Sequence, residues 1–216
     1  MDLDQVWFTI DAQRAQAADL LDTLTEQQWT TPSLCAGWRV REVAAHLTSA
    51  HTGIGKGVRS LVRARGSFDR MIRDTAIQQA ALPTSDYSAW LRSVAGSRRL
   101  VVGLTPMEPL LDILVHQQDI ARPLGIPLEM PRDAAAAAAQ RSWALGFPFW
   151  AKRRLRGLRL TAADADWTAG EGALVRAPIG ELLMLITGRS PDVRTLDGPG
   201  AARLAELVAQ REKAAR

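Results

Sequence analysis

Two residues on one predicted helix, Asp112 and His116, have the side-chain types and the spacing of a metal-binding pair. Residues four apart on an α-helix lie on the same face, about one turn from each other. A carboxylate and an imidazole so placed can hold one divalent ion, and His46 on an earlier helix could complete a set of three ligands. Three protein ligands with an open fourth position are typical of a catalytic zinc site, although nickel, iron or manganese would also accept such ligands.

A solvated helix face would produce the same pattern. Most carboxylate–histidine pairs at this spacing are surface ion pairs or helix-stabilising contacts. Glu108, Asp112, His116 and Asp119 form one polar stripe, as an exposed face would. Asp119 could orient a metal ligand, or it could pair with Arg122, three residues further on. The spacing alone leaves both interpretations open.

Three further residues near His46 have side chains that could take part in chemistry. Cys35 is the only cysteine of the chain, which excludes an internal disulfide. It precedes a helix, where a thiol can become reactive, but the commoner role of such a cysteine is that of a small buried apolar residue. His51 lies five residues after His46 and is therefore rotated off its face, so we do not expect it to be a ligand. We expect Trp38 to anchor its loop in the core.

Composition and charge indicate a folded protein and exclude several classes of function. The 216 residues are 47% hydrophobic and 23% charged, which is near the globular average. The net charge of +4 is concentrated in the run Lys152–Arg159, which could bind an acidic ligand or form the solvated end of a helix. Because no recognition motif accompanies that run, we expect no nucleic-acid partner. We find neither a signal peptide nor an apolar run of about 20 residues, and predict a cytoplasmic monomer or homodimer without membrane contact.

The spacing of apolar residues predicts helices over most of the first two thirds of the chain. Pro106 lies at an early helical position, and the Pro-Leu-Gly run at 123–125 is a stop signal for the helix that carries Asp112. An alanine-rich helix is expected to break near Pro148. The predicted helices cover 2–28, a segment from about 39, 67–82, 85–103, 105–122 and a segment from about 132.

The pattern changes after residue 156. Apolar residues alternate in 157–162 and again in 173–177, with a turn-rich segment between them, which predicts short antiparallel strands. Two further helices follow, the first with Pro178 at its start and Gly188 at its end. We therefore expect two domains, a helical bundle over 1–150 and a small α+β domain over 157–216.

Two segments resemble the signature segments of a known family. PSLCAGWRVREVAAHLTSA (32–50) and LLDILVHQQDIARPLG (110–125) are similar to those of the mycothiol-dependent maleylpyruvate isomerase family, part of the broader DinB/YfiT-like group of metal-binding bundles. Residues 157–189 resemble that family's small C-terminal domain. The resemblance implies a mainly α fold, with a DinB-like four-helix bundle followed by a small α+β domain.

The resemblance also implies a metal centre. The family's ligands are a histidine on the second helix and, on a later helix, an acid and a histidine four residues apart, which correspond here to His46, Asp112 and His116. The acid of the characterised isomerase is most often glutamate, so the shorter Asp112 is a departure that could change the geometry or affinity of the site. The family's C-terminal domain supplies an arginine to the active site, and Arg189 is the candidate by motif position. An arginine at a helix end is the structural alternative.

The implied activity is that of an enzyme with two cofactors, a divalent metal (zinc first, nickel as the alternative) and mycothiol or a similar thiol. A cation next to a thiol favours the thiolate, which is the nucleophilic form. The thiolate could add to a small electrophilic substrate and permit cis–trans isomerisation, or it could remain attached, as in a thiol transferase. The alternative is a non-catalytic DinB-like bundle that binds a small molecule or a protein partner.

Overall fold

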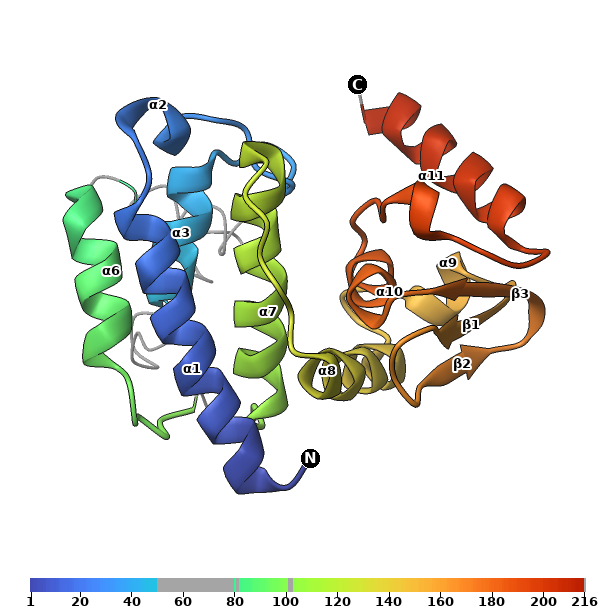
Figure 1. Ribbon diagram of the computed structural model, residues 1–216, viewed down its shortest axis with the longest axis horizontal. Coiled ribbons are helices and arrows are strands. Elements are labelled where there is room, and N and C mark those ends of the chain that lie inside the picture. Colours follow the sequence, from blue (N-terminus) through green and yellow to red (C-terminus); the bar gives the residue numbers. More distant parts are fainter. Residues whose placement is uncertain (50–79, 81, 101–102, 216) are drawn as a thin grey trace. The chain divides into compact units, whose positions relative to one another are not determined.

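The computed structural model describes residues 1–49, 80, 82–100 and 103–215. These residues group into two compact units, Asp2–Glu129 and Met130–Arg216. The first is helical and the second contains a small sheet (Figure 1), so the predicted mainly α fold class is confirmed. The predicted helix at 67–82, the continuation of the second helix beyond residue 49 and His51 lie outside the described residues. Among the described helices, none is long and apolar enough to cross a membrane.

Four helices of the first unit form a closed ring of packed pairs. Helix α1 packs against α6 and α7, and α3 packs against the same two helices (Figure 1). Each helix therefore has two neighbours, as in a four-helix bundle. The helices of this unit are α1 (Leu3–Asp22), α2 (Glu26–Trp29), α3 (Val40–Ser49), α6 (Thr84–Ser93) and α7 (Met107–Ala121).

Helix α1 has the apolar face that its sequence predicts. It begins with a capping box, in which the Asp2 side chain accepts from the Gln5 backbone N–H and the Gln5 side chain accepts from that of Asp2. Leu3, at the exposed end, is 61% exposed and does not join the core. The residues that recur at helical spacing and are buried include Val6, Ile10, Ala17, Leu20 and Leu21.

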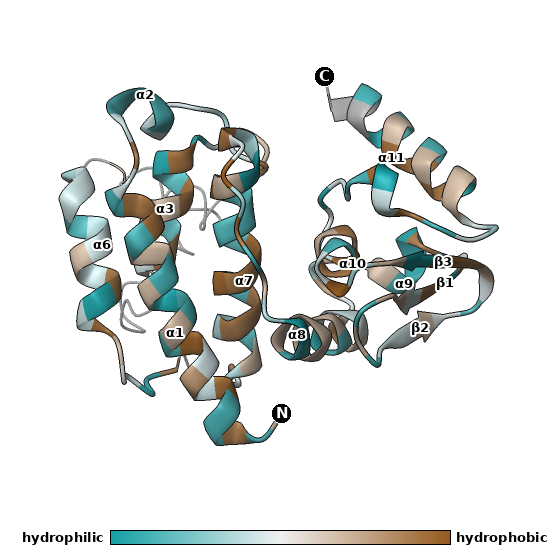
Figure 2. Ribbon diagram, in the orientation of Figure 1, coloured by the Kyte–Doolittle hydropathy of each residue, from teal (hydrophilic) through white to brown (hydrophobic). Residues whose placement is uncertain are grey.

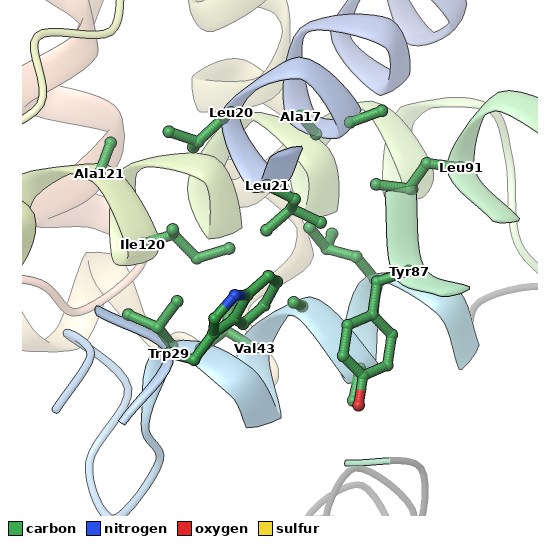
Figure 3. Close-up of a cluster of buried hydrophobic side chains, with 14 of the residues drawn as sticks. Ala17, Leu20, Leu21, Trp29, Val43, Tyr87, Leu91, Ile120 and Ala121 are labelled. Atoms are coloured by element: carbon green, nitrogen blue, oxygen red, sulfur yellow. The ribbon is translucent and has the colours of Figure 1, made fainter. Parts of the chain in front are cut away.

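The core of the bundle contains two aromatic rings from different elements. Trp29 of α2 and Tyr87 of α6 are buried, with ring centroids 5.8 Å apart (Figure 3). Leu21, Val43 and Ile120 bring α1, α3 and α7 into the same cluster. Burial of each such side chain stabilises the fold by roughly 1.5–3 kcal/mol, and together they hold α3 beside α7.

Ten residues of helix α7 between Leu110 and Ala121 are buried and none of its residues is exposed, so the helix is buried on nearly every side. Its ribbon has several hydrophobic stretches (Figure 2). At its start, the backbone N–H and the hydroxyl of Thr105 both donate to the Glu108 carboxylate, each over 2.6 Å. At its end, the chain continues into a short 3-10 turn at Arg122–Leu124, and Gly125 then takes a left-handed conformation with φ of 67°. Glycine is favoured there because a Cβ atom disfavours this conformation. The predicted stop of this helix is confirmed.

The second unit has a three-stranded sheet with strand order β2-β1-β3. Its central strand β1 pairs antiparallel with β2 but parallel with β3. The two segments predicted to be antiparallel strands, 157–162 and 173–177, correspond to β1 and β3, so that prediction is wrong for this pair. The helices of this unit are α8 (Arg132–Leu145), α9 (Ala151–Arg154), α10 (Ile179–Ile186) and α11 (Ala201–Ala215), with a 3-10 turn at Val193–Thr195. The strands are β1 (Gly157–Ala162), β2 (Thr168–Gly170) and β3 (Gly172–Ala177).

Glycines explain the parallel pairing. Gly170 ends β2 opposite Arg159, and only two residues later Gly172 begins β3 opposite Gly157. The chain therefore crosses from one edge of β1 to the other around the start of that strand. Gly172 has φ of 120°, and a Cβ atom there would lie 2.3 Å from the carbonyl oxygen of Gly157. Such a close crossing is open to glycine alone.

The alanine-rich helix α8 belongs to the second unit, whereas the predicted division placed residues 1–150 in the bundle. Four of its alanines face inward, and the helix packs against α10. Small side chains allow two helix backbones to approach closely, and the apolar α10 offers a face to cover. The boundary therefore precedes α8, at residues 129 and 130. The buried alanines are Ala134, Ala135, Ala138 and Ala139.

A buried arginine connects α1 to the chain after α6. Arg14 is 5% exposed, and its guanidinium donates to Asp11 and to the carbonyl oxygens of Val94 and Ser97. Arg98 donates to the other oxygen of Asp11 over 2.7 Å. Burial raises the pKa of Asp11, but its hydrogen bonds and the charges of Arg98 and Arg14 outweigh this effect and lower that pKa below 3.8.

We expect Asp11→Asn to lower the free energy of unfolding by about 1 kcal/mol at pH 7. Because the folded-state pKa of Asp11 is depressed, its contribution is present above about pH 4 and is lost as the pH falls through the folded-state value. Urea denaturation at pH 7 and pH 3 measures this, and the deficit of the variant should shrink at the lower pH. Asp19→Asn is the control, because Asp19 is 73% exposed in its pair with Arg92. An equal deficit at both pH values would contradict the assignment.

We expect Gly172→Ala to destabilise the second unit by about 2 kcal/mol or more, because the new Cβ would collide with backbone in a left-handed region. The matched control is Gly180→Ala in α10, where the nearest atom to a new Cβ is the sulfur of Met130 at 3.8 Å. That helical position should be neutral or gain up to about 1 kcal/mol. Thermal and urea denaturation of both variants measure the difference. Equal stabilities would argue against the crossing at Gly172.

Candidate metal centre

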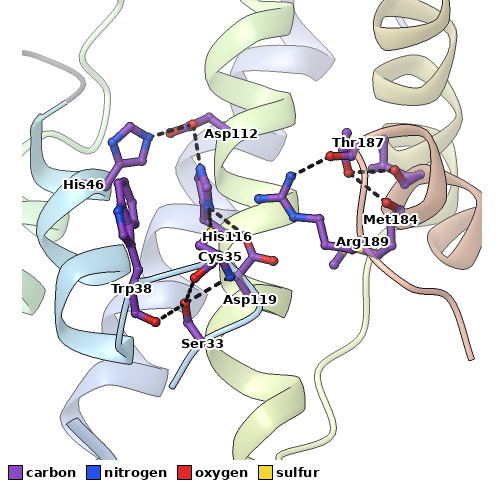
Figure 4. A network of polar contacts seen from close by, with 11 residues as sticks. Ser33, Cys35, Trp38, His46, Asp112, His116, Asp119, Met184, Thr187 and Arg189 are labelled. Atoms are coloured by element: carbon purple, nitrogen blue, oxygen red, sulfur yellow. Dashed lines mark hydrogen bonds and ion pairs between the residues drawn. The ribbon is translucent and has the colours of Figure 1, made fainter. Parts of the chain in front are cut away.

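The three predicted ligands come from two adjacent helices of the bundle. His46 lies near the end of α3, and Asp112 and His116 lie one turn apart on α7. Because α3 packs against α7, the side chains of the two helices face each other across the contact (Figure 4). The structure thus brings together all three residues that the resemblance implies as ligands.

One carboxylate oxygen lies between the two imidazole rings. Oδ1 of Asp112 is 3.3 Å from Nε2 of His46 and also 3.3 Å from Nε2 of His116 (Figure 4). The ring centroids of the histidines are 4.8 Å apart in an edge-to-face arrangement. The three donor atoms all lie within 4.8 Å of one another. Two imidazole nitrogens and one carboxylate oxygen therefore converge on a single point.

The charges at this point are mutually stabilising. Burial raises the pKa of Asp112, but the charges and hydrogen bonds of His46 and His116 outweigh it and hold that pKa well below its usual range. For His116, burial lowers the pKa, but the charge of Asp112 and hydrogen bonds with Asp112, Asp119 and Cys35 raise it well above its ordinary value. The side chains of His46, Asp112 and His116 remain 16%, 30% and 14% exposed, so solvent can reach the point at which they meet.

The other nitrogen of His116 binds a second carboxylate. Nδ1 of His116 lies 2.8 Å from Oδ2 of Asp119, whose side chain is fully buried. The guanidinium of Arg122, the other expected partner of Asp119, donates to the side chain of Gln118. The contact with His116 therefore favours the interpretation that Asp119 orients a metal ligand over the interpretation that it pairs with Arg122.

The polar stripe of α7 does not form an exposed face. Asp112 and His116 are only partly exposed and Asp119 has no exposed surface, and Val115 on the same helix is buried as well. The interpretation of this stripe as a solvated face is therefore wrong for residues 112–119. Its polar groups instead bind partners inside the bundle.

The loop before α3 is held in place by its own hydrogen bonds. The hydroxyl of Ser33 donates to the carbonyl oxygen of Trp38 and accepts from the backbone N–H of Cys35. Trp38 packs against the core, as predicted, and its ring also lies against His46 with centroids 5.4 Å apart. At the start of α3, the Glu42 carboxylate accepts from the backbone N–H of Arg39. The ring of His46 is therefore fixed between those of Trp38 and His116.

The contacts of Cys35 with the candidate metal centre are not predictable from the sequence. The thiol of Cys35 donates to Oδ2 of Asp119 over 3.1 Å and lies 3.7 Å from Nδ1 of His116. Cys35 also packs against the core, as expected for a small apolar residue. No local signal could have revealed the contact, because 84 residues separate Cys35 from Asp119.

Two groups of side chains among the described residues could hold a metal ion. His46, Asp112 and His116 offer the two-histidine, one-carboxylate set of catalytic zinc sites. In the second group, Cys35, His116 and Asp119, the carboxylate already accepts from the thiol and from the ring nitrogen. The first group therefore fits a metal better, and the second fits a set of supporting hydrogen bonds.

Arg189 lies in the second unit, just after α10. Its guanidinium donates to the carbonyl oxygen of Thr187 over 2.9 Å, and its backbone N–H donates to that of Met184 (Figure 4). Both contacts satisfy carbonyl groups at a helix end, as expected for an arginine with a structural role there. A role for Arg189 in the active site stays a prediction.

The basic run Lys152–Arg159 is partly structural. Arg154 turns inward and donates to the carbonyl oxygens of Leu185 and Ile186 at the end of α10. Burial, together with the charge of Arg211, lowers its pKa to about 10. The other basic residues of the run, Lys152, Arg153, Arg156 and Arg159, are exposed. The run is not a single helix end, because α9 ends at Arg154 and Arg159 lies on β1.

Comparison with known proteins agrees with the resemblance. Residues 10–99 match the family model "Mycothiol maleylpyruvate isomerase N-terminal domain"; this segment includes His46 and ends before Asp112. Two solved structures match, a mycothiol-dependent maleylpyruvate isomerase (TM-score 0.62, 13% identity) and a histidine-to-alanine mutant of a protein of that name (TM-score 0.61, 14% identity). Each alignment covers 93% of this chain and 94% of the other. No curated protein matches the sequence.

At these identities the structural likeness establishes the fold over nearly the whole chain, including the second unit. The family model establishes the relationship for the segment that contains the loop before α3 and His46. Residues 10–99 are thus similar to the N-terminal domain of the mycothiol-dependent maleylpyruvate isomerase family, and the chain as a whole shares the fold of the two solved structures.

Proposed function

We propose that this protein is a metal-dependent enzyme that uses mycothiol or a similar low-molecular-weight thiol for cis–trans isomerisation of a small electrophilic substrate related to maleylpyruvate. The observation that carries the proposal is the convergence of His46, Asp112 and His116 within 4.8 Å. The family and the fold support the choice of thiol and reaction. Transfer of the thiol to the substrate is the alternative chemistry of the same site.

His46, Asp112 and His116 are the residues that would hold the metal. Two imidazoles and a carboxylate suit zinc first, and nickel as the alternative. A bound divalent cation supplies positive charge that stabilises a thiolate and a developing oxyanion. Asp112 is one methylene shorter than the glutamate usual in the characterised isomerase, and its position beside both histidines supports its assignment as the acid ligand.

The side chains around the ligands prepare the site for this chemistry. The His46 ring is fixed by two neighbouring rings, which reduces the entropy that the ligand loses when it binds. Partial exposure of all three ligands leaves room for a further ligand from solvent. A thiolate adds reversibly to a conjugated alkene, so that rotation about the former double bond can occur before the sulfur leaves again. Because such thiols stay reduced in the cytoplasm, we place the activity there.

We expect protein purified without an affinity tag to contain about one divalent ion per chain. Removal of one of three ligands should abolish stoichiometric binding, so His46→Ala should lose the ion. Elemental analysis by mass spectrometry gives both the amount and the identity of the metal. The matched control is His51→Ala, which removes the one histidine that is not a predicted ligand. Equal metal content in His46→Ala and in the unchanged protein would overturn the proposed centre.

We expect maleylpyruvate to be isomerised only when both metal and thiol are present. His116→Ala should lower kcat/KM by about a thousandfold, since the charge of a metal contributes several kcal/mol to a transition state. Asp112→Glu should retain activity, whereas Asp112→Asn should lose most of it because the ligand charge is gone. The assay is the absorbance change of the substrate with and without mycothiol.

The outcomes separate the alternatives. A thiol adduct that accumulates in place of the isomer would assign the protein as a transferase. Stoichiometric metal without any thiol-dependent reaction on a panel of small electrophiles would indicate a non-catalytic bundle that binds a small molecule or partner.

A further inference from the structure

A chain of hydrogen bonds continues from the candidate metal centre into the bundle. Nδ1 of His116 and the thiol of Cys35 both lie within hydrogen-bond distance of the same oxygen, Oδ2 of Asp119, at 2.8 and 3.1 Å. The Asp119 side chain has no exposed surface. A carboxylate oxygen accepts hydrogen bonds. The thiol donates to it, and the tautomer of His116 with its proton on Nδ1 donates to the same oxygen.

This arrangement determines which nitrogen of His116 is available to a metal. Because Nδ1 donates to Asp119, Nε2 is the nitrogen that can give a lone pair, and Nε2 is the atom that faces Asp112. A carboxylate that accepts from the remote nitrogen of a histidine fixes the ring orientation and makes the other nitrogen a better ligand. The position of Asp119 therefore bears directly on metal affinity.

Asp119 is in turn held by the loop before α3, through two bonds. The Cys35 thiol binds its side chain, and the backbone N–H of Leu34 donates to its carbonyl oxygen over 3.2 Å. The same loop carries Trp38, whose ring lies against His46. One loop thus binds Asp119, which contacts His116, and also supplies Trp38, which contacts His46. The two histidines belong to different helices.

We propose that Asp119 and Cys35 are positioning residues of the metal centre, in which the Cys35 thiol holds the Asp119 carboxylate and that carboxylate holds His116 with Nε2 directed at the metal. Cys35 is then neither a ligand nor a nucleophile. The inference rests on the proposed metal-dependent function, because the centre that it supports is the one proposed there.

Zinc affinity of the metal-free protein, measured by competition with a chelating dye, tests the chain of hydrogen bonds. We expect Asp119→Asn to bind zinc about 10- to 100-fold more weakly, as for other residues that support a ligand. Cys35→Ala should weaken binding by about two- to tenfold, the value of one hydrogen bond. Cys35→Ser retains a donor and should recover most of that loss. Asp11→Asn, which removes a carboxylate elsewhere in the bundle, controls for lowered stability and should bind as the unchanged protein does.

A second measurement reports on His116 itself. In zinc-loaded protein with ¹⁵N-labelled histidine, the proton on Nδ1 of His116 should exchange slowly with water, and faster in Asp119→Asn and Cys35→Ala. A role of these residues in packing alone would leave that exchange rate unchanged. This readout needs no substrate, and Cys35→Ala still tests the idea if Asp119→Asn does not fold.

Three results would overturn the inference. Unchanged zinc affinity and proton exchange in both variants would remove the positioning role while the metal centre stands. A sulfur-to-cobalt charge-transfer band in cobalt-loaded protein, lost in Cys35→Ala, would make Cys35 a ligand. No zinc binding by the unchanged protein would instead be a failure of the proposed function itself.

Discussion

The burial of α7 on nearly every side is the constraint on which the rest of the N-terminal unit depends. A buried polar group without a partner costs roughly 1–3 kcal/mol, so hydrogen bonds made by the buried polar side chains of this helix stabilise the fold. Gln117 donates to the side chain and the backbone oxygen of Gln13 on α1, and Gln118 donates to the carbonyl oxygen of Leu128. These contacts tie α7 to the elements around it.

The candidate metal centre follows from the same requirement. Asp112 binds His46 across the contact between α3 and α7, and Asp119 binds His116 and the thiol of Cys35. Because hydrogen bonds are directional, the bonds of these two carboxylates align α7 with α3 and with the loop before it. The groups that make these bonds are also the donors that a divalent ion requires.

The C-terminal unit depends on a different constraint, which is the close passage of the chain around the start of β1. Gly172 permits the crossing, and β3 then lies parallel to β1. Helix α10 follows β3, and α8 covers α10 with its alanines. Arg154 satisfies carbonyl groups at the end of α10, and Arg189 satisfies those just beyond it. Basic residues of this unit thus contribute to its own architecture.

The sequence by itself determined the features that arise from neighbouring residues. Apolar spacing predicted a helix over 2–28, which the structure divides into α1 and the short α2, and it predicted α7. Pro-Leu-Gly predicted where α7 ends, and the interval of four residues placed Asp112 and His116 on one face. Resemblance added His46 from another helix. Only the tertiary structure decided that the polar stripe of α7 faces inward, because spacing records the relation of residues within a helix but not what packs against it.

The tertiary structure also decided the features that depend on distant parts of the chain. The contact of Cys35 with Asp119 joins residues 84 positions apart, the pairing of β1 with β3 depends on a crossing at Gly172, and α8 belongs to the second unit because α10 offers it a face. Each of these is set by packing between elements, whereas residue spacing and turn signals act within one element at a time.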